Sequence, residues 1–319
     1  MITALILLAY ASLVGVYGAR LVNNAAWTRR APRLAILFWQ ALAVSVLASV
    51  ALAGLAVAFP MAPGAGQLAD LLHTCVMLLR SRYASPGGAM VSSAGLLLAA
   101  GVALRMAWCF TVAVRDVAIR RTAQRDFVAI LGEHVQDLSV DVVAHDRCAV
   151  YCVPGRRARV VVTSAALEAL DDEQLTAVLA HERAHLRGRH DLVVLSLEVL
   201  RRAFAFVPLF KVAADEVAGL VEMVADDAAA ARNDRVVLAT ALVRLASGTA
   251  PAGALGAGGA GALARVRRLV DDDGHRLGRG RTALLLASVL AVAALPLIMA
   301  SAPALGIIAA NYCPLSFHA

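Results

Sequence analysis

The apolar residues of this chain gather in four long runs, separated by segments of mixed or polar character. The runs cover residues 2–19, 34–59, 89–114 and 282–310. Because about 20 mostly apolar residues are needed to cross a bilayer as a helix, each run predicts a transmembrane helix. The first run has no positive charge before its apolar part, which a cleaved signal peptide would require, so we expect it to be retained.

The segment between the third and fourth runs shows the patterns of shorter helices and strands instead of one long apolar run. A basic amphipathic helix over 115–135 is expected to continue the third span. Two β-branched runs on either side of Pro154 and Gly155 predict a strand, a turn and a second strand. The helical period of the apolar residues and the residues that end helices then predict four helices, at 172–187, 191–207, 213–231 and 234–247. A flexible Gly/Ala-rich loop is predicted at 247–264.

These elements predict a mainly α integral membrane protein. Three transmembrane helices occupy 1–114, and a fourth helix with a short tail occupies 282–319. Between them, residues 115–281 form an α+β domain. Heavy use of alanine, arginine and glycine is typical of a bacterium with a GC-rich genome.

The charge pattern gives this arrangement an orientation. The net charge is +7, and 29 of the 30 basic residues are arginines. They concentrate in 20–33, after the third run and before the fourth, which predicts that these parts are cytoplasmic and both termini external. This explains the basic balance better than nucleic-acid binding, which we do not expect. Arg105 lies inside the third run, and we expect it to face other helices or the cytoplasmic end, the alternative being a functional charge.

The five cysteines do not form a C-x-x-C pair. We therefore expect free thiols in a reducing compartment, consistent with a plasma-membrane protein whose central domain is cytoplasmic.

The chemistry concentrates in "HERAH", within the helix that Asp171-Asp172 opens and Gly188 is expected to end. His181 and His185 are four residues apart, so both imidazoles lie on one helix face and can reach one metal ion. Glu182 lies beside this pair, where a general base for a metal-bound water is needed. The pattern predicts a catalytic zinc site, with one zinc ion per chain.

A catalytic zinc site needs a third protein ligand, which should come from another helix. Glu198, Glu216 and Glu222 are candidates, and Glu222 is favoured because Asp226 follows one turn later. An aspartate there can accept the second N–H of a ligating histidine, whereas Asp227 points elsewhere. We expect His190 to be a surface residue and Asp191 to cap the next helix.

The stretch from "VYCVPGRRARVVVTS" through "HERAH" to "VEMVADDAAA" resembles the BlaR/MecR-type antirepressor membrane metallopeptidases, metallopeptidase family fifty-six. It is similar, more distantly, to HtpX-type and CAAX prenyl proteases. The resemblance implies a gluzincin-type zinc site with ligands His181, His185 and Glu222, catalytic Glu182 and helix residue Asp226. It departs from the antibiotic-sensing members because nine residues after the fourth helix cannot form a penicillin-binding sensor domain.

We therefore expect a membrane-embedded zinc endopeptidase that hydrolyses peptide bonds at the cytoplasmic side. The resemblance implies signal-dependent cleavage of a transcriptional repressor, such as a winged-helix protein. The alternatives are a housekeeping HtpX-like protease and a non-enzymatic zinc-binding transducer. The expected partners are a protein substrate, which could add as a strand along 159–162, and the lipid bilayer.

Overall fold

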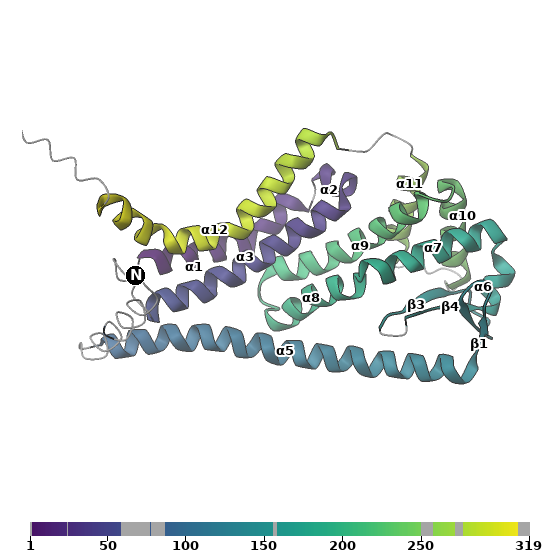
Figure 1. Cartoon of the computed structure of the whole chain (residues 1–319), viewed down its shortest axis with the longest axis horizontal. Helices are drawn as coiled ribbons and strands as arrows, with labels where there is room; N and C mark the ends of the chain where they lie inside the picture. Colours follow the sequence, from purple (N-terminus) through teal and green to yellow (C-terminus); the bar gives the residue numbers. More distant parts are fainter. Residues whose placement is uncertain are drawn as a thin grey trace, which may run out of the picture.

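The computed structural model describes residues 2–23, 25–58, 77, 87–155, 158–249, 258–271 and 277–311. Most of the predicted loop 60–88 and the final tail lie outside these residues. Figure 1 shows long helices running side by side at one end of an elongated molecule, and shorter helices with a small sheet at the other. The second group carries the residues of the predicted zinc site.

Within the part of the chain that the structure describes, four helices are long and apolar enough to cross a membrane. They are α1 (Ile2–Val22), α3 (Pro32–Ala58), α5 (Gly88–Leu131) and the Arg279–Ala302 part of α12 (Arg279–Asn311). A short helix, α2 (Ala26–Arg30), joins α1 to α3. These lengths and compositions support a membrane protein, while the sidedness of the chain stays a prediction.

The helix α5 is a single element that continues well past the third predicted span. It ends at Leu131, so the basic helix expected over 115–135 is four residues shorter than predicted. Gly132 leaves the helix with extended backbone, and residues 132–135 instead pair with a neighbouring strand. Pairing with partners 5 to 11 residues further along the chain is an effect that local helix propensity does not show.

The sheet has four strands in the order β1-β2-β4-β3. The predicted pair is present as β3 (Val150–Val153) and β4 (Arg159–Thr163), which are antiparallel. Two strands were not predicted: β1 (Gly132–Val135) and β2 (Val140–Val143), which run antiparallel to each other. Because β2 pairs in parallel with β4, the strand β4 is central, and its expected role as a free edge is wrong. The edge strands are β1 and β3.

The helices after the sheet follow the predicted order with changed ends. They are α6 (Ser164–Ala169), α7 (Asp172–Gly188), α8 (His190–Ala203), α9 (Pro208–Ala230), α10 (Arg235–Thr249) and α11 (Gly258–Val270). Pro208 starts α9 at its first position, where the missing N–H costs nothing. The prediction of a Gly/Ala-rich loop is wrong in part, because 258–264 form the first turns of α11. Residues 250–257 lie outside the described part.

The core has two main parts that meet around α7, α8 and α9. The apolar face of α7, with Leu175, Val178 and Leu179, packs on the sheet. The helices α8 and α9 pack instead against α1 and α3 in a separate cluster. The site-bearing helices are therefore held between the sheet and the apolar helices.

Candidate metal centre

The helix α7 presents the "HERAH" motif from a firmly capped start. The side chain of Asp171 accepts a hydrogen bond from the backbone N–H of Gln174 at 2.9 Å, as the sequence predicts. At the other end Gly188 is still helical, and Arg189 takes the left-handed conformation at φ 46°. Gly188 is needed for a different reason, because a Cβ there would collide with the ring of His190.

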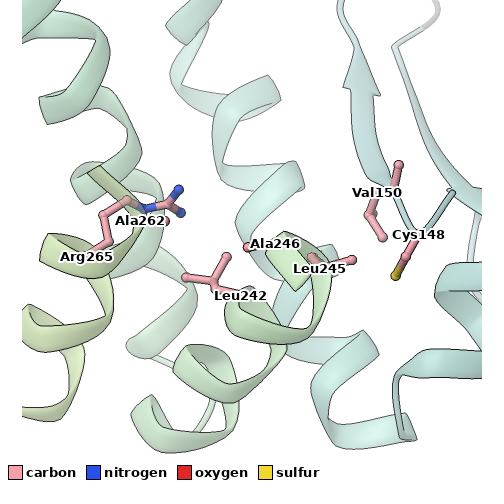
Figure 2. Close-up of a pocket in the computed structure, with 8 residues that line it drawn as sticks. Cys148, Val150, Leu242, Leu245, Ala246, Ala262 and Arg265 are labelled. Carbon is pink, nitrogen blue, oxygen red and sulfur yellow. The ribbon is translucent and has the colours of Figure 1, made fainter. Parts of the chain in front are cut away.

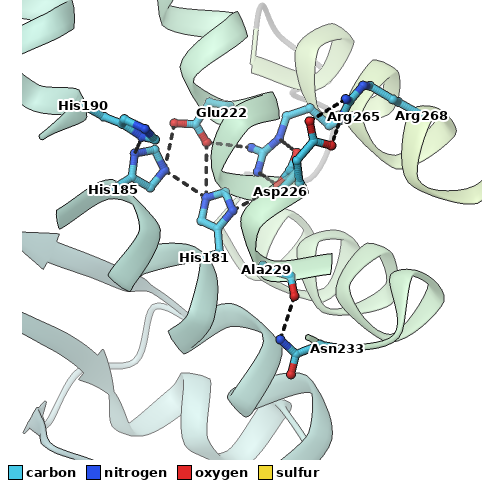
Figure 3. Close-up of polar contacts among 10 residues, drawn as sticks. His181, His185, His190, Glu222, Asp226, Ala229, Asn233, Arg265 and Arg268 are labelled. Atoms are coloured by element: carbon cyan, nitrogen blue, oxygen red, sulfur yellow. Dashed lines mark hydrogen bonds and ion pairs between the residues drawn. The ribbon is translucent and has the colours of Figure 1, made fainter. Parts of the chain in front are cut away.

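The three predicted ligands converge on one point (Figure 3). One donor atom from each of His181, His185 and Glu222 lies within 4.8 Å of the other two. The His181 and His185 Nε2 atoms are 3.1 Å apart, and the Glu222 oxygens lie 3.6 Å and 3.4 Å from them. A zinc tetrahedron with bonds of about 2.05 Å has edges of about 3.3 Å, so this donor set fits zinc in both chemistry and spacing.

The other candidate ligands lie apart from this group. Glu198 is held by Arg201 and Arg202 on its own helix, at 2.7 Å from each. Asp227 pairs with Arg268 at 2.7 Å. Among the described residues, the donor group around His181 includes neither of these, nor Glu216.

The second nitrogen of His181 faces a buried carboxylate. His181 Nδ1 lies 3.0 Å from Asp226 Oδ1, the neighbour predicted for it. Burial lowers the pKa of His181, but Asp226 and Glu222 together raise it to about 9 in the metal-free chain. Burial raises the pKa of the Asp226 carboxyl, but hydrogen bonds from Arg265 and His181 outweigh it and hold this pKa below the usual value.

A cation that sequence reasoning missed completes this side of the site. Arg265 of α11 donates two hydrogen bonds to Asp226, at 2.7 Å and 2.8 Å, and its third nitrogen lies 3.0 Å from Glu222. Burial lowers the pKa of Arg265, yet its carboxylate neighbours raise it overall. The Gly/Ala-rich run before it concealed α11, although "ARVRRLV" has an amphipathic pattern.

The second nitrogen of His185 faces another histidine. His190 is buried, with 7% of its surface exposed, and its Nδ1 lies 3.1 Å from His185 Nδ1. The expectation that His190 is a surface residue is therefore wrong, because α8 starts at His190 and turns its ring under α7. Burial is the main cause that lowers the pKa of His185 to about 4.

The prediction that Asp191 caps α8 is wrong. Its carboxylate pairs instead with Arg121 of α5. The N-cap position belongs to Arg189, which makes no side-chain cap hydrogen bond.

Glu182 is placed between the ligands and the edge of the sheet. Burial raises the pKa of its carboxyl, and a side-chain hydrogen bond links it to Cys152 of β3. Burial and the nearby Glu182 raise the pKa of the Cys152 thiol to about 12. Among the described residues, the group that could hold a metal ion consists of His181, His185 and Glu222 and does not include this thiol.

Two of the cavities beside the described residues of the site bear on its chemistry. One, of about 400 Å³, is lined by residues of both the site and β3, including Cys152, Pro154, His185 and Glu222. The other, of about 270 Å³, lies behind Arg265, between α10, α11 and the start of β3 (Figure 2). Only the first opens on the ligand atoms, so it is the space in which a substrate would meet the metal.

The comparison with family models agrees with this geometry. Residues 115–271 match Peptidase family M48. The M48 match begins within α5, ends just after α11 and contains every residue of the donor group. It supports a membrane-type zinc metallopeptidase, but it does not extend to the narrower BlaR/MecR type. No curated protein and no solved structure matches the chain.

Proposed function

We propose that the chain is a membrane-bound zinc endopeptidase that hydrolyses peptide bonds of protein substrates at the cytoplasmic side. The convergence of His181, His185 and Glu222, inside the segment that matches family M48, carries the proposal. Two imidazoles and one carboxylate are the ligands of open, catalytic zinc sites, which leave a position for water or substrate.

Each residue of the site then has a distinct task. His181, His185 and Glu222 would hold the ion, which when bound polarises a carbonyl and acidifies a water molecule. Glu182 takes the proton of the attacking water and delivers it to the leaving amine nitrogen. Asp226 accepts from His181 Nδ1, which keeps the Nε2 lone pair directed at the ligand position.

The substrate is proposed to bind along β3. This strand is an edge of the sheet and has its Cys152 beside Glu182, so an extended peptide paired with it would pass the catalytic carboxylate. The same reasoning that suggested residues 159–162 therefore applies to 150–153.

Replacing Glu182 with Gln tests the enzymatic proposal. Peptide hydrolysis by the purified full-length chain should fall by about 10² to 10⁴-fold, the usual contribution of a general base, while bound zinc stays at one ion per chain. Glu173→Gln, in the exposed first turn of the same helix, is the matched control and should retain activity. Equal activity of the two variants would refute the role of Glu182 and favour a non-enzymatic zinc-binding transducer.

The resemblance to antirepressor peptidases leads us to propose a transcriptional repressor as the physiological substrate. In cells that express Glu182→Gln in place of the natural chain, an intact repressor should accumulate among few other proteins. Broad accumulation of unfolded membrane proteins would instead identify a housekeeping protease. In both outcomes the comparison is with the Glu173→Gln strain.

A further inference from the structure

The turn between α8 and α9 is wholly apolar and lies between charged residues, Arg201 and Arg202 before it and Lys211 after it. Residues 203–210, "AFAFVPLF", form this hairpin tip, and Phe206 at its end is 78% exposed. Ala205 and Pro208 are exposed as well and Val207 is only half-buried, so the tip presents a contiguous apolar patch, the kind that marks an interaction site. The tip therefore needs an explanation that the metal site does not provide.

The hairpin tip packs among the helices that we expect to cross the membrane. Figure 1 shows α8 and α9 lying between α3 and α5. Phe204, Leu209 and Phe210 share one buried cluster with residues of α1 and α3, including Trp39 and Leu42. The tip thus belongs to the packing of the apolar helices, although it lies within the sequence of the metallopeptidase domain.

Glycines of α1 provide the room for this contact. A Cβ on Gly15 would lie 3.2 Å from Val207 Cγ1, and one on Gly18 would lie 3.8 Å from Leu209 Cδ1. Gly15 is seven residues from Val22, where α1 ends, which is about 10 Å along the helix. The tip therefore reaches about 10 Å past the end of α1 towards its middle.

Arg105 of α5 supplies a donor at the same depth. Its Nε donates a hydrogen bond to the carbonyl of Ala203, in the last residue of α8. A helix C-terminus presents carbonyls without helical partners, and hydrocarbon offers no water to satisfy them. Arg105 thus offsets a polar group that would otherwise be costly in lipid, and the negative end of the helix dipole stabilises its charge.

The charged residues of α8 set a limit to the depth. Arg202 pairs with Asp116 at 3.0 Å, two residues beyond the predicted end of the third span. Glu198 binds both Arg201 and Arg202, so these charges are paired and lie on the cytoplasmic side of the tip. Only the tip itself is free of charge.

We propose that the hairpin tip is inserted in the cytoplasmic leaflet of the bilayer, with Phe206 against lipid acyl chains. The proposal rests on the membrane placement in the proposed function, and it adds an anchor within the metallopeptidase domain. Glu222 lies 14 residues after Pro208 on α9, about 21 Å along a continuous helix. The anchor therefore holds the metal site close to the membrane surface, where it can reach peptide bonds near a bilayer.

Three apolar residues allow a matched test, because the fractions of their surfaces that the rest of the chain leaves exposed are almost equal. Phe206 is 78% exposed, Leu97 within the third span is 71%, and Ile130 at the far end of α5 is 79%. Each is changed to Cys in a full-length chain whose natural cysteines are alanine and whose zinc uptake is intact. A membrane-impermeant maleimide is then applied to vesicles from the side that labels Ile130→Cys.

Phe206→Cys and Leu97→Cys should both react at least about tenfold more slowly than Ile130→Cys, since a thiol in lipid does not ionise readily. All three should react alike once the vesicles are dissolved in denaturing detergent. If Phe206→Cys reacts as fast as Ile130→Cys while Leu97→Cys is protected, the inserted tip is refuted and the membrane spans stand. If Leu97→Cys also reacts fast, the membrane placement fails together with the proposal.

Discussion

The two histidines proposed as ligands are four residues apart on one helix, yet they are supported by opposite kinds of partner. Behind His181 lie a buried carboxylate and a partly buried guanidinium, those of Asp226 and Arg265. Behind His185 lies a neutral imidazole, that of His190. The carboxylates Asp226 and Glu222 raise the pKa of His181 to about 9, whereas burial is the main cause that lowers the pKa of His185 to about 4.

This difference shows that one motif can combine two ways of fixing a ligand. A carboxylate partner fixes the tautomer and also makes the imidazole a stronger donor to a metal. A neutral partner fixes only the tautomer, because His190 Nδ1 can accept the His185 N–H without adding charge. The two sides should therefore contribute unequally to zinc affinity and to the stability of the fold.

The largest effect is expected at Asp226. Asp226→Asn should lower zinc affinity by about 10 to 100-fold, and it should also destabilise the fold by about 3 kcal/mol because Arg265 loses its main partner in a buried position. Competition with a chelator and thermal unfolding in detergent measure the two effects.

Asp227→Asn is the matched control for this change. Asp227 pairs with Arg268 at a more exposed position, where an ion pair contributes about 0–1 kcal/mol. The double change Asp226→Asn with Arg265→Met should recover part of the stability and none of the zinc affinity. Equal effects of Asp226→Asn and Asp227→Asn would remove the distinction between the two sides.

A smaller effect is expected on the other side of the site. His190→Phe keeps the ring volume and removes the acceptor for His185, so zinc affinity should fall by about tenfold. His190→Asn can place its amide oxygen near the Nδ1 position and should retain most of the affinity. If both variants bind zinc as tightly as the natural chain, His190 only fills space.

The sequence was sufficient for the features that depend on local spacing. Four apolar runs of membrane length recur as four long apolar helices, and the cap at Asp171 is present. The side chains predicted as ligands lie close together, since i, i+4 spacing places His181 beside His185, and Asp226 beside the helix face of Glu222. An α-helix fixes such relations without any knowledge of the rest of the chain.

The features that the sequence did not reveal depend on contacts between distant segments. Arg265 reaches the site from a helix 39 residues after Asp226, and β2 pairs with β4 across 20 positions. His190 follows a helix end that was placed at Gly188, but the left-handed residue is Arg189. Moving the end of α7 by one residue turns the side chain of His190 away from solvent and into the site.

Gly188 offers a subtler test of the His185 side. Gly188→Ala should displace the ring of His190 and weaken zinc binding less than tenfold, since the ring can shift partly. Alanine is about 1 kcal/mol better than glycine inside a helix, so stability should not fall with affinity. Gly219→Ala on α9, where a Cβ meets open space, is the control and should leave zinc affinity unchanged. A parallel loss of both quantities would point to general damage of α7.

The smallest effect concerns a second His–Asp–Arg group, which lies in the sheet. Asp141 binds His134 at 2.7 Å and Arg159 at 2.9 Å, in the same arrangement as His181, Asp226 and Arg265. Burial raises the pKa of the Asp141 carboxyl, but His134 and Arg159 together lower it by more, so the pKa lies below its ordinary value of 3.8. Its partners are about half exposed, and Asp141→Asn should therefore cost only about 1 kcal/mol near pH 5.

The pH dependence of that cost has a definite sign. A carboxyl whose pKa is depressed by folding stabilises the fold above its unfolded pKa of 3.8, and this contribution is lost as the pH falls towards the folded value. The difference in unfolding temperature between the natural chain and Asp141→Asn should thus be full at pH 5 and shrink below about pH 4. A difference that stays constant down to pH 3 would show that the Asp141 charge does not stabilise this trio. The larger effect expected at Asp226 could then not be assigned to the charge of its carboxylate.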